Sequence, residues 1–567
     1  LPGIPAPPLA LWQPANLRVG VNAAGTLSIT DGGMVAGPGQ ALLGSAVGSS
    51  GTVMVSGNDS LFSTVLQMHV GSSGTGTLKI EDRGTANIGT FLYIGRFIGS
   101  DGLVTVSGAG SRLTNGNMMQ VGSEGTGALI IEDGATVNST NVTRIGWSST
   151  GIGTAIVQGS GSSWTTNNSM SVGFGGSGRL LIVDGGAVSN VEGFVGRETG
   201  STGEVTVSGA GSSWSNSAAL EIGSFGMGEL MVEDGGALSN TDGRIGREAG
   251  AIGTVTIKDA GSTWSNTGTL YIGDLGKGTL TVADGGKANI VASFVIGRQA
   301  GAEGLVTLSG AGSSLINTSS TQVGGAGKGT LIVENGGVGQ SNNLSVGVSS
   351  GSTGSVVVRG ADSRWIAGSI LTIGASGHGT LTIEDGGSVT STLTTIGSNT
   401  SGLGEATVSG ADSTWTNSGA LIVGALGNGT LTVSDGGMVS NATAGIGVGT
   451  GRQGAALVSG AGARWINSGD LTVGTNGSAT LTVADGGHVS VGGGNGIVHV
   501  AEAATANGVV NIGAAAGSAP VGAGTLGAAE VRFGDGTGRL NFNHTDSAYL
   551  FSPVITGNGA LNHYSGT

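Results

Sequence analysis

The chain has 567 residues, of which 119 are glycine, 8 are proline and none is cysteine, and its formal net charge is −14. The lack of cysteine excludes disulfide bonds, thiolate metal ligands and a cysteine nucleophile. A nucleic-acid-binding face needs a stripe of lysine and arginine, whereas the 21 basic residues are scattered along an acidic chain, so no nucleic-acid partner is expected.

Residues 1–16 form a proline-rich segment that holds five of the eight prolines. The segment lacks the basic start of a secretory signal peptide, so we interpret it as a mature or trimmed terminus that caps the fold. Further along the chain, Gly, Ser, Thr or Asn interrupts every apolar run well before the roughly 20 residues that a membrane-spanning helix needs. No transmembrane segment is therefore expected.

Residues 17–490 consist of two alternating phrases. The first, typified by GTLTVADGG, places a polar residue before Gly-Gly, and the second, typified by GTVTVSGAGSxW, lies midway between its copies. Related units thus recur about every 25 residues and are paired into repeats of about 50 residues. The polar position of the first phrase is asparagine at Asn335 and aspartate at Asp31, Asp82, Asp133, Asp184, Asp234, Asp284, Asp385, Asp435 and Asp485.

Each unit carries the signature of a short β-strand followed by a sharp turn. Leu280 and Val282 alternate with Thr281 and Ala283, which is the period-2 pattern of a strand. Asp-Gly-Gly and Gly-Ala-Gly supply positive-φ positions for turns, and units this short bury an apolar face only by stacking. The sequence therefore predicts an all-β fold, a right-handed parallel β-helix of about 20 rungs with ~25 residues per rung, the right hand being the default for parallel crossovers.

A bulky residue follows the second marker by five positions. It is tryptophan in six repeats: Trp164, Trp214, Trp264, Trp365, Trp415 and Trp465. These side chains would lie above one another on alternate rungs, either as an aromatic stripe that stacks on carbohydrate or as a hydrophobic plug inside the corner. Leucine replaces tryptophan at Leu113 and Leu315, which a plug tolerates, so the plug is favoured.

The column of aspartates has two interpretations as well. Stacked carboxylates could bind Ca²⁺ or act as an acid–base pair. A site that is used once is not expected in ten copies, however, and an aspartate before Gly-Gly is suited to capping the N–H groups of its own turn. We therefore predict that the aspartates and tryptophans are structural ladders and that the chain has no catalytic residue, metal site or cofactor.

Histidine and arginine give no stronger candidate. The six histidines form no metal-ligand pair, and His488 and His499 are the only two that could come close. Four arginines occupy the same corner after an Ile-Gly or Val-Gly pair: Arg96, Arg197, Arg247 and Arg298. They could form a basic ridge for an anionic partner, but in an acidic chain a solvated edge that discourages lateral pairing is favoured.

The repeats resemble the glycine-rich repeats of bacterial autotransporter (type V secretion) passenger domains. The matching phrases are GTLTVADGG, YIGDLGKGTLTV, VTVSGAGSSW and IGREAG within residues 17–490, and residues 524–567 are similar to the segment that follows such repeats. The resemblance implies that residues 491–567 are a less regular continuation of the β-helix, and that the chain is a fragment that ends before any translocator barrel.

The resemblance also implies a function and a location. The chain would be a rod that is secreted or displayed at the bacterial surface, tethered through a barrel or released, and it would act as an adhesin without catalysis. Its partner would be a host receptor, an extracellular-matrix protein or the same protein on a neighbouring cell. A released signalling or toxin-like ligand is the alternative, and a polysaccharide-active β-helix enzyme is a third possibility.

Overall fold

The computed structural model describes residues 11–567 and is an all-β parallel β-solenoid of about 22 turns with ~25 residues per turn. The predicted fold class is confirmed, while the right hand of the winding stays a prediction. Part of the proline-rich segment, residues 1–10, lies outside the described residues. Within residues 11–567 the one helix is a short 3₁₀ turn, η1 (Gly492–Gly494).

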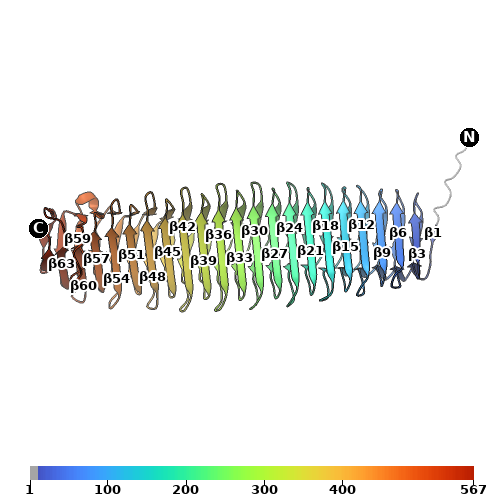
Figure 1. Cartoon of the computed structure of the whole chain (residues 1–567), viewed down its shortest axis with the longest axis horizontal. Helices are drawn as coiled ribbons and strands as arrows, with labels where there is room; N and C mark the ends of the chain where they lie inside the picture. Colours follow the sequence, from blue (N-terminus) through green and yellow to red (C-terminus); the bar gives the residue numbers. More distant parts are fainter. Residues whose placement is uncertain (1–10) are drawn as a thin grey trace, which may run out of the picture. The chain divides into compact units, whose positions relative to one another are not determined.

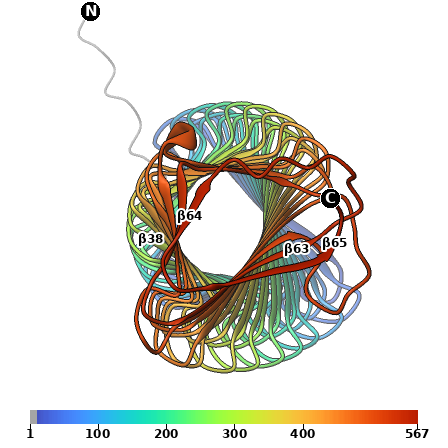
Figure 2. The same cartoon turned by 90° about the vertical axis from the view of Figure 1, so that its left-hand side faces the viewer.

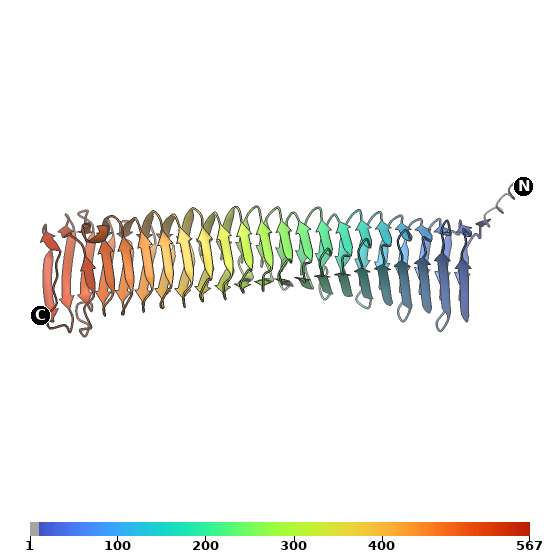
Figure 3. The ribbon, with the colours of Figure 1, turned by 90° about the horizontal axis from the view of Figure 1, so that it is seen from above.

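The described chain divides into two compact units. Unit 1 comprises residues 11–269, 276–280 and 286–288, and unit 2 comprises residues 270–275, 281–285 and 289–567. Each unit is built from three parallel sheets, to which every complete turn contributes one strand. Figure 1 faces the sheet of long strands, and Figure 3 shows the same strands from above.

One turn of unit 1 illustrates the pattern. The strands β9 (Thr75–Glu81), β10 (Thr85–Ile88) and β11 (Leu92–Ile94) follow one another along the chain. They belong to what we call the long sheet, the middle sheet and the short sheet, respectively. Each pairs in register with its counterpart one turn later: β12 (Asp101–Ser107), β13 (Arg112–Asn115) and β14 (Met119–Val121).

The alternation of apolar residues along each strand fills the interior of the turns. In β9 and β12 the paired residues Leu78 and Val104 are fully buried, as are Ile80 and Val106 one alternation later. The glycine at the start of each long strand is required by a close approach of the backbone. A Cβ on Gly76 would lie 1.9 Å from the backbone nitrogen of Gly71, so no larger residue fits between the two strands of that corner.

Unit 2 has the three kinds of sheet up to its end. The strands β57 (Ser478–Ala484), β60 (Asn507–Gly513), β63 (Thr537–Asn543) and β65 (Ala560–Ser565) pair successively in the long sheet. Figure 2 looks along the stack from this end, with β63 and β65 on one side of the coil and β64 (Val554–Thr556) on another. Residues 491–567 therefore continue the solenoid, with longer loops between strands.

Candidate binding surface

The aspartates of the first phrase all occupy the left-handed region of backbone space directly after a long strand. In unit 1 Asp133 has φ 55° and in unit 2 Asp385 has φ 53°, and Asn335, with φ 54°, takes the same conformation. Asparagine and aspartate tolerate this region better than other residues that carry a side chain. The ladder of aspartates thus reflects a backbone requirement of the turn.

The turn is capped differently from the sequence prediction, because the cap is a serine from the next turn. The Gly134 N–H donates to Ser162 Oγ at 3.0 Å, and the Gly386 N–H donates to Ser413 Oγ at 3.0 Å. The carboxylates of Asp82, Asp234 and Asp485 accept from a serine hydroxyl of the preceding turn, as in the 2.9 Å bond from Ser56 Oγ to Asp82 Oδ2. The repeat register brings these serines to the turn, which the local sequence did not reveal.

The six tryptophans are buried inside the turns, with at most 1% of each side chain exposed. Trp214 lies between Val188 and Leu238 of the flanking turns in the middle sheet. Its indole Nε1–H donates to Asn190 Oδ1 at 2.7 Å, and Trp465 donates to Asn441 Oδ1 at the same distance. This burial excludes an exposed stripe of indoles and fits the interior plug.

The histidines are spread over several strands. His488 lies in β58 (His488–Val491) of the middle sheet and His499 in β59 (Ile497–Val500) of the short sheet, where its Nε2 is 3.8 Å from Asp470 Oδ2. His69 is 6% exposed, and burial, followed by the positive charge of Arg96, lowers its pKa to about 4. His544 is buried as well, with 2% of its surface exposed.

The outward face of the short sheet in unit 1 gathers aromatic and arginine side chains from neighbouring turns. The strands that carry it are β11 (Leu92–Ile94), β14 (Met119–Val121), β17 (Thr143–Ile145), β20 (Met170–Val172), β23 (Gly193–Val195), β26 (Leu220–Ile222) and β29 (Gly243–Ile245). One column of side chains comes from the middle residue of each strand, and a second comes from the residue after the glycine that ends it. We call the aromatic and arginine residues that these columns hold from β11 to β23 the aromatic–arginine surface: Tyr93, Arg96, Arg144, Trp147, Phe174, Phe194 and Arg197.

Where one column supplies an arginine of this surface, the other column supplies an aromatic residue in the same turn, so that each guanidinium lies over a ring. The Cζ atom of Arg96 is 3.9 Å from the ring centroid of Tyr93, and that of Arg197 is 4.2 Å from Phe194. Arg144 has the reverse arrangement, with its Cζ 4.0 Å from the Trp147 ring in the second column. Such stacking fixes the plane of each guanidinium.

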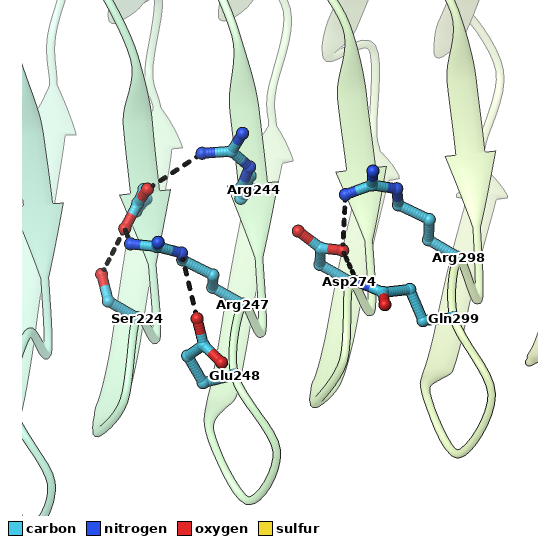
Figure 4. A network of polar contacts seen from close by, with 8 residues as sticks. Ser224, Arg244, Arg247, Glu248, Asp274, Arg298 and Gln299 are labelled. Atoms are coloured by element: carbon cyan, nitrogen blue, oxygen red, sulfur yellow. Dashed lines mark hydrogen bonds and ion pairs between the residues drawn. The ribbon is translucent and has the colours of Figure 1, made fainter.

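Further along the short sheet, the chain supplies a carboxylate to the arginines itself. Glu221 is 4% exposed and accepts hydrogen bonds from Arg244 Nη1 at 3.2 Å and from Arg247 Nη1 at 3.0 Å. Ser224 Oγ also donates to Glu221 at 3.0 Å, so the buried carboxylate has three donors (Figure 4). In unit 2, Arg298 Nη1 donates to Asp274 Oδ1 at 2.9 Å.

The corner arginines make specific contacts within the chain that the sequence did not predict, while their role as an edge that discourages lateral pairing stays a prediction. Arg96, Arg197, Arg247 and Arg298 are partly buried and stack on rings or bind carboxylates of their own unit. The physical reason is that the residue after the glycine faces the same surface as the middle residue of the strand. A guanidinium in one column therefore contacts the side chain of the other column, which is an aromatic ring for Arg96 and Arg197 and the carboxylate of Glu221 for Arg247.

An acidic cluster elsewhere in unit 1 has its own partners within the chain. The carboxylates of Glu233, Asp234 and Asp259 lie within 4.8 Å of one another. Lys258 Nζ is 2.9 Å from Glu233 Oε2, and Ser208 Oγ donates to Asp234 Oδ2 at 3.0 Å. These contacts account for the cluster as a surface ion pair and a hydrogen bond, so it supports no assignment of a metal.

Comparisons with known proteins give a sequence relative and a structural neighbour. No family model matches the chain. Over 193 residues it is 36% identical to the uncharacterized lipoprotein YdeK of Escherichia coli (strain K12), a match that covers 33% of this chain and 14% of that protein. Among solved structures, the TibC-catalysed hyper-glycosylated TibA fragment has 20% identity and a TM-score of 0.35, covering 58% of this chain and 92% of that one. Throughout residues 11–567, no helix has both the length and the apolar character that crossing a bilayer requires.

The sequence prediction found part of the aromatic–arginine surface and missed the rest. Arg96 and Arg197 were singled out, whereas Tyr93, Arg144 and Trp147 were not. A signal was present, because the residue two positions before the glycine of each Ile-Gly or Val-Gly pair faces outward in every turn. Aligning all turns on that glycine would have placed both columns side by side.

Proposed function

We propose that the chain belongs to a secreted or surface-displayed passenger of the autotransporter kind, and that it acts outside the cell as an adhesin-type binding protein without catalysis. Its partner in this proposal is a host receptor, a matrix protein or the same protein on a neighbouring cell. Nucleic acid is not among the partners, because the basic residues of this acidic chain form no continuous stripe.

The observation that supports a binding role is the aromatic–arginine surface itself. The interior of the turns is filled by apolar side chains, so the chemistry that differs between repeats is on the outside. Tryptophan, tyrosine and arginine are the residue types that contribute most to binding energy at protein interfaces. The sequence phrases shared with autotransporter passengers support the extracellular location.

Attachment of coated beads tests this proposal. Beads that carry the purified chain are added to epithelial cells, to immobilised matrix proteins and to one another. The double variant Arg144→Gln/Arg197→Gln removes two charges from the surface, and Arg112→Gln/Arg364→Gln removes two exposed arginines from the middle sheet as a matched control. We expect attachment to at least one of these targets, with loss in the first variant and retention in the control.

Other results would contradict the proposal. If the beads attach to none of the targets, the chain is not an adhesin for them. If both variants attach equally well, the chain adheres through a surface other than the aromatic–arginine surface. A cellular response to the soluble chain without attachment would favour a released signalling ligand. Turnover of pectin, alginate or peptidoglycan that is lost on changing one pair of carboxylates would overturn the non-catalytic assignment.

A further inference from the structure

Three arginines of the aromatic–arginine surface are partly buried and have no carboxylate within ion-pair distance among residues 11–567: Arg96, Arg144 and Arg197. Arg96 Nη1 donates to Ser123 Oγ at 3.3 Å, and Arg197 Nη1 donates to Ser171 Oγ at 3.4 Å. The Nε atoms of Arg96 and Arg144 are buried without a hydrogen-bond partner. Partial burial of a charge without a counter-ion is unfavourable, and a bound anion would offset that cost.

The same sheet shows which anion the surface accepts. Ser171, Phe194 and Glu221 are paired successively in the short sheet, so Ser171 and Glu221 occupy the same column two turns apart. Arg247 Nη1 donates to Glu221 at 3.0 Å, whereas the corresponding Arg197 Nη1 reaches only the hydroxyl of Ser171. The acceptor for the arginine is thus the carboxylate of Glu221 in one repeat and only the hydroxyl of Ser171 in another.

We propose that Arg96, Arg144 and Arg197 bind the carboxylates of an acidic polysaccharide of the uronic-acid type. The proposal rests on the proposed function and names the class of ligand that this surface recognises. Each guanidinium donates hydrogen bonds to one carboxylate, and the rings that it stacks on hold its plane in place.

The spacing along the surface suits a polymer that lies parallel to the direction of stacking. Arg96, Arg144 and Arg197 belong to alternate turns, and parallel strands lie ~4.8 Å apart, so successive arginines are about 9.6 Å apart along the stack. Trp147, in the turn of Arg144, stacks on Phe174 of the next turn, with ring centroids 4.6 Å apart. The three charged groups thus recur at a regular interval along the surface.

Two features favour a sparsely charged polysaccharide over other polyanions. The strands β14, β17 and β20 are paired on both sides, so an acidic peptide finds no free strand edge to extend. Glu124 and Glu198 occupy equivalent sequence positions, two residues after the glycine of their turns, and their negative charges disfavour a ligand with closely spaced charges. Duplex DNA, with one charge per roughly 1.7 Å of its axis, would meet this repulsion along its whole length.

Calorimetry with polygalacturonate as the probe tests the inference. Fully methyl-esterified polygalacturonate removes the charge, and poly-L-glutamate represents an acidic peptide. Arg197→Gln and Arg144→Gln remove single guanidinium groups, with Arg112→Gln as the control. Ser171→Glu leaves every arginine in place but supplies an internal carboxylate to Arg197, as Glu221 does for Arg247, and thermal unfolding of each variant confirms that it is folded.

We expect polygalacturonate to bind, the ester not to bind, and each arginine substitution to weaken binding about tenfold. Ser171→Glu should weaken binding by a similar factor. Binding that is unchanged in folded Ser171→Glu and Arg197→Gln, absence of binding to polygalacturonate, or tighter binding of poly-L-glutamate would overturn the inference. If the coated beads still attach to cells in any of these cases, the adhesin role stands and only the class of ligand is wrong.

Discussion

The turn at Asp435 in unit 2 lacks the serine cap that the eight preceding turns of the first phrase share, and adding a serine there tests how the turns hold together. The Oγ atom of a serine accepts from a backbone N–H of the preceding turn in eight places: Ser60, Ser111, Ser162, Ser212, Ser262, Ser313, Ser363 and Ser413. The next position in the series is Ala463, which is fully buried and whose N–H donates to Gly460 O at 3.1 Å, just as the Ser413 N–H donates to Gly410 O. The backbone of this corner is therefore the same, and only the hydroxyl is missing.

The substitution Ala463→Ser should stabilise this turn by about 1 kcal/mol, because a buried intramolecular hydrogen bond contributes roughly 0.5–1.5 kcal/mol net. The new hydroxyl would accept from the Gly436 N–H, as Ser413 Oγ accepts from the Gly386 N–H at 3.0 Å. In three other turns the serine also donates to the strand end four residues earlier, as in the 2.7 Å bond from Ser212 Oγ to Ser208 O. The converse change, Ser413→Ala, should cost about 1–3 kcal/mol because it leaves a buried donor unpaired.

Hydrogen exchange followed by mass spectrometry is the appropriate assay, because a stack of repeats unfolds in sections and a single midpoint averages over them. Amide exchange of the peptide around Gly436 should slow about fivefold in Ala463→Ser, the factor that corresponds to about 1 kcal/mol. Ala463→Val, which adds volume without a hydroxyl, serves as the control. Exchange at Gly436 that is equal in the wild type and in Ala463→Ser would refute the assignment of the serine as the cap.

Three further predictions concern a buried histidine, a buried tryptophan and a turn aspartate. The pKa of His69 is about 4 in the folded state and near 6.5 in the unfolded state, so the unfolded state binds a proton at a higher pH than the folded state does. The free energy of unfolding should therefore fall by about 3 kcal/mol between roughly pH 6.5 and pH 4. A denaturation series over this pH range in which His69→Phe shows the same loss would contradict the prediction. Asn240→Ala should cost about 1–3 kcal/mol, because the Trp264 Nε1–H that donates to Asn240 Oδ1 at 2.6 Å loses its acceptor; an unchanged unfolding midpoint would count against this role. At Asp133, with φ 55°, Asp133→Gly should change the free energy of unfolding by only a few tenths of a kcal/mol, whereas Asp133→Val should lower it by about 1–2 kcal/mol. Equal thermal stability of the two variants would be inconsistent with the backbone explanation.

The sequence by itself determined the repeating unit, the strands and the manner of stacking. The alternation of Leu280 and Val282 with polar neighbours defines a strand with one buried face, and units of about 25 residues bury that face only against their neighbours. Leu113 and Leu315, which substitute for tryptophan, already indicated that this position is an interior one. These features are local, or recur at a fixed interval, so they can be read along the chain.

The tertiary structure alone decided which side chains meet between turns. Ser162 caps the turn that contains Gly134, Arg197 donates to Ser171 of the preceding turn, and Glu221 accepts from Arg244 and Arg247 of the next turn. Each contact depends on the register of strands from different turns and on the direction in which a corner residue points. Local propensity does not encode that register, because a shift of one residue reverses the face of every side chain in a strand. The contacts that make one face of the short sheet a binding surface therefore arise only when the turns are stacked.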